Sequence, residues 1–238
     1  MKQIIAIFTM LLLSVAVGVG VAGAAELQTA PTVLFFAAGF TLAGLNPVQN
    51  ALGSLLTDLQ KSSRNNMGGL RVILYFGKYD DVETWPTSAD QESATGAMDS
   101  LAVLTGDVVM KTGKRMFELY ATLGEIELKN TLVGPIDGQC FKQELSIKHP
   151  GLAAKLIGFQ AATNNENLFF ILERHNGTKY MMGAEGMPVM KTKDDGGSGK
   201  KIEDGAFTEM TFECYGFTPA PIYAGTVPLT VAGSSSGA

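Results

Sequence analysis

Residues 141–148 read FKQELSIK and decide the fold class of this chain. Two sets of side chains alternate along the stretch, a mostly apolar set of Phe141, Gln143, Leu145 and Ile147 and a polar set of Lys142, Glu144, Ser146 and Lys148. Successive side chains of a strand point to opposite faces, so this alternation is typical of a strand with one buried and one wet face. The stretch therefore predicts an antiparallel sheet.

Other short strands are expected on both sides of this stretch. Their ranges are 71–76, 101–104, 108–111, 116–122, 125–128, 168–173 and 179–182, and a last strand holds the alternating residues 209–214. Asn176-Gly177 favours a two-residue type I′ hairpin between two of them. The segment 152–165 places Leu152, Leu156 and Phe159 at helical spacing. We predict a mainly β domain with one helix (α+β), an antiparallel β-sandwich or barrel of short strands, preceded by one or two apolar N-terminal helices.

Two long loops complete this expectation. Residues 80–97 begin with Asp80, Asp81 and Glu83, and residues 190–204 include DDGGSGKK at 194–201. Gly, Asn, Ser and charged residues in runs are typical of loops, and we expect residues 194–201 to form a flexible tip. Pro219 and Pro221 are expected to end the last strand.

The first 45 residues are unusually apolar. An uncharged run covers residues 4–22 and ends in Ala22-Gly23-Ala24-Ala25, which offers an A-x-A cleavage site. A second apolar stretch has its centre at residues 32–45. Three interpretations remain open at this stage: a cleaved signal peptide, a membrane hairpin formed through residues 4–45, or an assembly arm that becomes ordered by contact with partner molecules.

These patterns divide the chain into four parts. We expect a signal-like or membrane-seeking segment at 1–25, an apolar helical segment with a linker at 26–65, a β-rich structural domain at 66–228 and a disordered tail at 229–238.

Composition excludes several classes of function. The net charge is −5 and the pI is about 5.1, with no basic cluster, which argues against non-specific binding to nucleic acid. Cys140 and Cys214 stand far apart without CxxC spacing, so zinc ribbons and thioredoxin-like sites are not expected. We predict two buried free thiols, while a disulfide remains the alternative for an oxidising compartment.

No catalytic, cofactor-binding or metal-binding residues are predicted. The two histidines, His149 and His175, stand at a Pro-Gly corner and a hairpin tip, and the chain has no G-x-S-x-G motif. Gly197-Ser198-Gly199-Lys200 lacks the first glycine and the final Ser or Thr of a Walker motif. The pairs Asp80-Asp81 and Asp194-Asp195 lack the alternating spacing of a calcium loop.

The order of these elements resembles the tail-tube and major tail proteins of tailed bacteriophages. The residues that carry the resemblance are GGLRVILYFGKYDDVETWP (68–86), HPGLAAKLIGF (149–159), LFFILERHNGTKYMMGAEGMPV (168–189) and FTEMTFECYGFTPAPIYAG (207–225). The resemblance covers residues 66 to 226 and rests on a pattern of elements.

This resemblance implies a non-enzymatic virion structural protein that self-assembles into rings or tubes through its strand edges. Its partners would be copies of itself and other virion proteins, its location the virion tail, and DNA would pass through only as cargo, without specific contacts or a cofactor. The alternative is an exported or membrane-tethered β-sandwich protein of the cell envelope that binds a ligand or partner.

Overall fold

The computed structural model describes residues 58–59, 67–89 and 98–232. Contacts divide the chain into two units, residues 1–56 and 57–238, and the description concerns the second. The predictions for residues 1–25 and for nearly all of 26–65 fall outside the described residues. Within the described part, no helix has the length and apolar character required to cross a bilayer.

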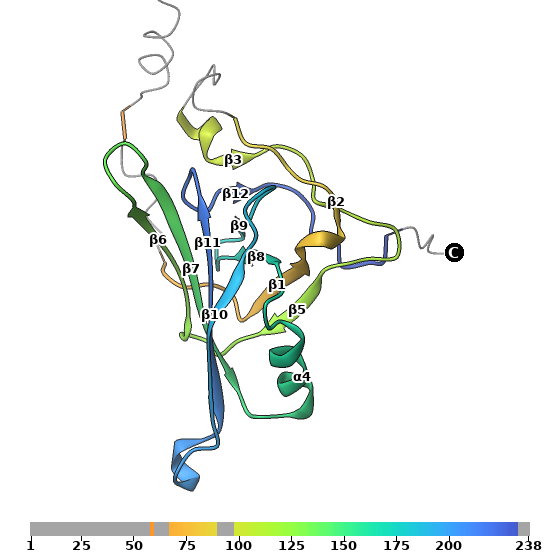
Figure 1. The fold of residues 1–238 in the computed structure, drawn as a ribbon, viewed down its shortest axis with the longest axis vertical. Helices are drawn as coiled ribbons and strands as arrows, with labels where there is room; N and C mark the ends of the chain where they lie inside the picture. The colour runs from red at the N-terminus through yellow and green to blue at the C-terminus, as the bar shows by residue number, and fades with distance from the viewer. Residues whose placement is uncertain (1–57, 60–66, 90–97, 233–238) are drawn as a thin grey trace, which may run out of the picture. The chain divides into compact units, whose positions relative to one another are not determined.

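The described chain is mainly β, and its elements follow one another as Figure 1 shows. The strands are β1 Ile73–Lys78, β2 Val82–Thr84, β3 Val103–Leu104, β4 Val109–Met110, β5 Phe117–Tyr120, β6 Ile126–Val133, β7 Cys140–Pro150, β8 Leu168–Glu173, β9 Lys179–Met182, β10 Met190–Gly197, β11 Phe207–Gly216 and β12 Ile222–Tyr223. The α-helix is α4 Ala154–Ala162, and three 3₁₀ turns lie at Tyr79–Asp81, Met98–Leu101 and Ile202–Asp204. The predicted mainly β class with one helix is thereby confirmed.

The strands form three sheets. The six-stranded sheet has the order β3-β12-β9-β8-β1-β5, the four-stranded sheet the order β10-β11-β7-β6, and β2 pairs with β4. Every pairing is antiparallel except the parallel contact of β12 with β3. Most neighbours in the sheets are thus joined as antiparallel ladders.

The stretch FKQELSIK lies in β7, at the centre of the four-stranded sheet. Its alternation is confirmed, because Gln143, Leu145 and Ile147 are 4%, 0% and 2% exposed. These residues face the six-stranded sheet, and both sheets contribute to one apolar core that also receives Leu156 and Phe159 from α4. The opposite face of the four-stranded sheet stays in contact with solvent.

Strand β8 is buried on both of its faces. Phe170 belongs to the core shared with the four-stranded sheet, whereas its neighbours Phe169 and Ile171 belong to a second core on the far side. A strand covered on both faces needs apolar residues at successive positions, which explains the unbroken run LFFIL. The observed bounds of β8 and β9 agree with the predicted strands, but the predicted two-residue type I′ turn is wrong. Arg174 and Thr178 bond across a three-residue loop, in which Gly177 has a positive φ and Asn176 does not.

The C-terminal segment covers the second core. Val227, Leu229 and Ala232 pack against it, and the Ala232 amide donates to the carbonyl oxygen of Lys114 over 3.0 Å. The part of the expected tail that the structure describes, residues 229–232, therefore lies against the domain.

Two loop predictions are wrong. Residues 190–197 form β10, which pairs with β11 through a ladder that continues to Gly197. Residues 80–84 form a 3₁₀ turn and β2. In both places backbone hydrogen bonds to a partner strand, β11 for β10 and β4 for β2, stabilise an extended segment whose residues have low strand propensity. The predicted strand at 101–104 is also shorter, because Leu101 ends a 3₁₀ turn.

Candidate assembly surface

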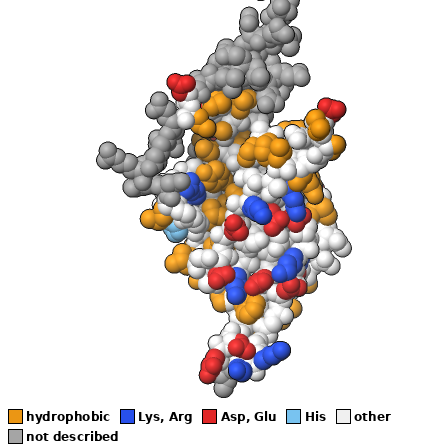
Figure 2. All heavy atoms as spheres, turned by 90° about the vertical axis from the view of Figure 1, so that its left-hand side faces the viewer, with side chains coloured by type: hydrophobic (Ala, Val, Ile, Leu, Met, Phe, Trp, Pro, Cys, Tyr) orange, Lys and Arg blue, Asp and Glu red, His pale blue; other side chains and the backbone are white. Residues whose placement is uncertain are grey.

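The solvent face of the four-stranded sheet carries a mosaic of opposite charges, visible as interleaved red and blue side chains in Figure 2. Lys142 on β7 forms ion pairs with Glu213 on β11 at 2.8 Å and with Glu144 at 3.3 Å. Lys148 pairs with Glu209 at 3.7 Å. Glu144 and Glu213 face each other directly across β7 and β11, and Lys142, which pairs with both, offsets their repulsion. The face therefore has no patch of one sign.

The mosaic continues onto the outer strand β10. Lys193 lies 3.1 Å from Asp195 and 3.6 Å from Glu209. Lys193 is half exposed and Asp195 is largely exposed, so each pair on its own contributes little to folding stability, typically about 0–1 kcal/mol. These charges remain available to a neighbouring molecule.

Both edges of this sheet are open within the described part of the chain. The edge strands β6 and β10 are each eight residues long, and each has one partner strand. The four strands alternate in direction, so β6 and β10 run opposite to each other. Long open edges present unpaired N–H and C=O groups that readily bind another strand.

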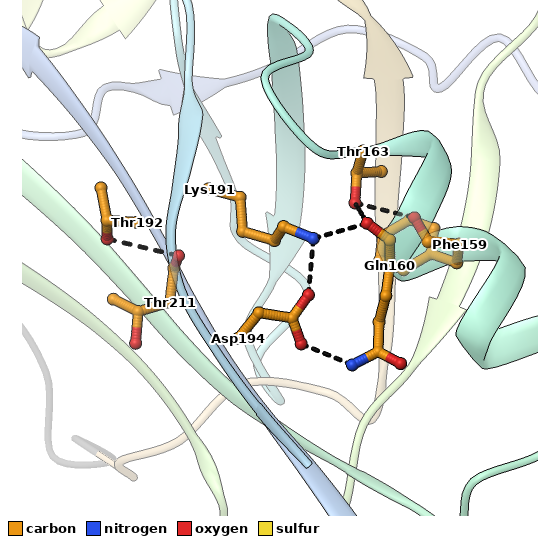
Figure 3. A network of polar contacts seen from close by, with 7 residues as sticks. All are labelled: Phe159, Gln160, Thr163, Lys191, Thr192, Asp194 and Thr211. Carbon is orange, nitrogen blue, oxygen red and sulfur yellow. Dashed lines mark hydrogen bonds and ion pairs between the residues drawn. The ribbon is translucent and has the colours of Figure 1, made fainter.

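A polar network holds β10 against α4 (Figure 3). The Lys191 ammonium donates to the Gln160 carbonyl oxygen over 2.7 Å and to Asp194 Oδ2 over 2.5 Å. The Gln160 amide in turn donates to Asp194 Oδ1. Gln160 lies in the last turn of α4, where its carbonyl oxygen also accepts from the Thr163 hydroxyl at 3.5 Å. Lys191 adds a charged donor to this carbonyl and complements the helix dipole.

One extra residue interrupts the β10 ladder. Lys191 pairs with Phe212 and Lys193 with Thr211, so Thr192 forms a bulge. Its hydroxyl lies 3.4 Å from the Thr211 carbonyl oxygen. Bulges twist a strand and are common at sheet edges.

Exposed apolar side chains surround one end of the sheet. Ile136, in the β6–β7 connection, is 90% exposed, and Phe217, directly after β11, is 81% exposed. Leu132 and Tyr215 nearby are about half exposed. Figure 2 shows hydrophobic side chains gathered toward the upper part of this face. A cluster of large exposed apolar groups is typical of a contact surface.

A pocket of about 310 Å³ lies beneath this end, between the two sheets and the 183–187 turn. Cys214 lines it and donates from Sγ to Gln143 Oε1 at 3.3 Å. Burial raises the pKa of the Cys214 thiol from 9.0 to about 12, with a smaller opposing effect of the Gly183 backbone. The thiol is therefore protonated at neutral pH and is a poor nucleophile.

The two cysteines are both free thiols, as predicted, although only Cys214 is fully buried and Cys140 is half-buried. They cannot pair within one chain as folded. Cys214 faces the core and Cys140 the opposite side, since their strand partners are Gln143 and Val133.

The histidines lie apart from each other and from the cysteines. His149 Nδ1 is 2.8 Å from the Pro150 carbonyl oxygen, and its ring contacts Tyr120 edge-on. His175 stands on the β8–β9 turn beside Gly69, in a second, more open pocket next to the start of β6.

The acidic pairs and the glycine-rich loop have partners of their own. Asp81 pairs with Lys114 at 3.1 Å. The Asp204 carboxylate accepts hydrogen bonds from the amides of Lys200 and Lys201, which occupies the donors that a phosphate would need. Among the described residues no group of three His, Cys, Asp or Glu side chains could hold a metal ion.

The open edge of β10 was missed by the sequence analysis. Its residues MKTKDDGG lack apolar alternation, and the bulge at Thr192 breaks any period of two. The alternation along β11 predicts that strand but not the partner that lies along its outer edge.

No protein-family model, curated protein or solved structure matches this chain.

Proposed function

We propose that this chain is a non-enzymatic structural protein whose copies join into a ring or tube, resembling the tail tube of a bacteriophage. The observation that supports it is the pair of open edges, β6 and β10, equal in length and opposite in direction. A head-to-tail contact between two different surfaces produces closed rings or open filaments.

The directions of the strands suit such a contact. When β6 of one copy lies beside β10 of the next, the two strands are antiparallel, and the alternation continues through the junction. Closing the ring removes every open edge of this sheet. The edges that would cause uncontrolled aggregation of a monomer thereby become the assembly contact.

The charged face would then line the inside of the ring, because the rest of the domain covers the other face. Basic residues at this face are Lys129, Lys142, Lys148 and Lys193, and acidic ones are Glu127, Glu144, Asp195, Glu209 and Glu213. Strong DNA binding requires an excess of basic groups that neutralise phosphates. A near-balanced, slightly acidic face would let DNA pass without holding it.

The test is the oligomeric state of the full-length protein, measured by light scattering on a sizing column and by negative-stain microscopy. Rings or tubes are expected. A monomer at every concentration up to the millimolar range would overturn the proposal.

A proline substitution supplies the matched control. The Gly151 amide donates to the Ala206 carbonyl oxygen, so these two residues form a hydrogen-bonded pair at the end of the β7–β11 ladder. Hydrogen-bonded and non-hydrogen-bonded pairs alternate along an antiparallel ladder. Phe141, ten residues before Gly151, therefore also directs its backbone N–H and C=O toward β11. Its partner Leu132 consequently directs its N–H to the open side. Leu132→Pro should yield a folded monomer, whereas Leu132→Ala, which keeps the N–H, should still assemble.

The apolar residues 4–45 favour the second candidate, an exported or membrane-tethered envelope protein. The intact mass of the protein from separated membrane and soluble fractions distinguishes the two. A chain shortened near Ala24 that stays monomeric would support export, and uncleaved chains in rings would support the tube.

A further inference from the structure

The faces of β6 and β10 limit how two copies can join. Successive side chains point to opposite faces of a strand, so a shift of the register by one residue moves each side chain to the other face. The charged face is therefore continuous across the junction only in registers that differ from one another by two residues or a multiple of two. The residues on this face of β6 are Glu127, Lys129, Thr131 and Val133, because they pair with the outward residues of β7. Those of β10 are Lys193 and Asp195, with Met190 beyond the bulge.

Residues that face one another across the four strands of one copy form a row. In a junction without offset, each row of one copy lies in line with the same row of the next copy. Glu127 would then face Lys193, and Lys129 would face Met190. Only the first half of β6 would meet β10, which halves the backbone hydrogen bonds. Glu125, just before β6, would also face Asp195.

An offset of two residues brings like charges together. Glu127 would face Asp195, and Lys129 would face Lys193. Both pairs lie directly opposite on one face, where like charges destabilise strand pairing. Two like-charge pairs therefore disfavour this register.

An offset of four residues satisfies both edges. Lys129 faces Asp195, and Val133 faces Met190. Lys193 then faces Thr131 and Glu127 faces Gly197, so no charge faces another of the same sign. The two eight-residue strands then overlap over their whole length, apart from the bulge. We propose that the copies join in this register, with Lys129 of one copy paired to Asp195 of the next; the inference rests on the proposed function.

The same offset fits the geometry of a closed barrel. Within one copy, Lys129 lies in the row of Glu144 on β7, and Asp195 lies in the row of Lys148. These two rows are four residues apart along β7. Four residues over four strands is one residue per strand, whatever the number of copies. An eight-stranded barrel with a shear of eight has this ratio and a strand tilt of about 36°. Closed barrels require a tilt in this range, and a junction without offset would leave the strands untilted.

Charge reversal tests the pair. Lys129→Glu and Asp195→Lys should each raise the concentration for half-assembly about tenfold at low salt, because attraction becomes repulsion at every junction. An equimolar mixture of the two variants should assemble like the wild type, since each junction in an alternating ring is again complementary. Glu127→Lys is the matched control on the same strand and face, and should change assembly less than about twofold.

Engineered disulfides test the register. Thr131→Cys with Lys193→Cys, in a Cys140→Ser chain, should form covalent oligomers on oxidation, because facing residues of a non-bonded antiparallel pair lie about 4.5 Å apart at Cα, within disulfide reach. Glu127→Cys with Lys193→Cys reports the junction without offset, and Glu127→Cys with Asp195→Cys the offset of two. Rings that form a cross-link in either of these two chains would contradict the proposed register but not the proposed ring. A wild-type monomer would overturn the proposed function itself.

Discussion

The Lys191 ammonium on β10 donates to the Gln160 carbonyl oxygen in the last turn of α4, and its side chain is only 7% exposed. This contact ties an edge strand to the single α-helix of the described chain. Burying an ammonium is unfavourable unless it is paired and hydrogen-bonded, and here Asp194 and the carbonyl supply both partners. The network consequently fixes where the open edge of β10 lies.

Replacing Lys191 should destabilise the fold. Lys191→Met leaves the Asp194 carboxylate without its cation and removes the shorter of two hydrogen bonds to the Gln160 carbonyl, which should lower the free energy of unfolding by about 1–3 kcal/mol. Urea titration followed by circular dichroism measures this. Lys193→Met, on the same strand but half exposed, should cost less than about 1 kcal/mol, and equal losses for both variants would refute the role of the network.

Gly77 on β1 should not tolerate a side chain. The Phe169 ring lies over it, and an added Cβ would stand 2.6 Å from Phe169 Cζ. Gly77→Ala forces that ring from its place against Trp85 and should cost about 1–3 kcal/mol. Gly158→Ala in α4 meets no atom within 4 Å and should stabilise the protein by about 0.5–1 kcal/mol. Thermal denaturation of the two variants gives the comparison.

Tyr223 joins the C-terminal segment to the second core through its hydroxyl. The hydroxyl accepts from the Val108 amide at 3.0 Å and donates to the Thr226 carbonyl at 2.7 Å, and Tyr223 is 2% exposed. Tyr223→Phe leaves both backbone groups without this partner and should reduce stability by about 1–3 kcal/mol. Faster proteolysis after Thr226 at unchanged far-UV circular dichroism would locate the effect, and unchanged proteolysis would contradict it.

The two thiols should differ in reactivity. Cys140 is half-buried, whereas Cys214 is buried with a raised pKa. A thiol reagent should therefore label one cysteine in the native protein and two in urea. Cys140→Ser should abolish the native signal, and native labelling that survives this substitution would contradict the assignment.

Alkaline pH should weaken the fold partly through Cys214. Its pKa is about 12 in the folded chain and 9.0 as a free group, so the unfolded chain loses the proton first. The contribution is fully present below pH 9 and is lost as the pH rises from 9 toward 12. Between pH 9 and 10.5, stability should fall by up to about 1.4 kcal/mol per pH unit more in the wild type than in Cys214→Ser. Equal slopes would contradict this.

Local patterns predicted those elements whose residues suit their environment. FKQELSIK alternates because one face of β7 is buried, and Asn176-Gly177 favours the turn that joins β8 to β9. β10 could not be predicted in this way, since its order comes from pairing with β11, the next strand, and from the contact of Lys191 with Gln160, 31 residues away. Likewise, nothing within β6 alone indicates that no other described strand pairs with its outer edge.

The strict alternation along β7 and β11 separates two kinds of evolutionary constraint. Core positions such as Leu145 and Phe212 must preserve volume, whereas the charges of the diagonal neighbours Glu213 and Lys142 need only remain complementary. Among related sequences, the solvent face should therefore vary by paired charge reversals while the core changes little. Such covariation would extend between β6 and β10 if the two strands meet across copies, so a future collection of relatives could reveal the assembly contact without any structure of the ring.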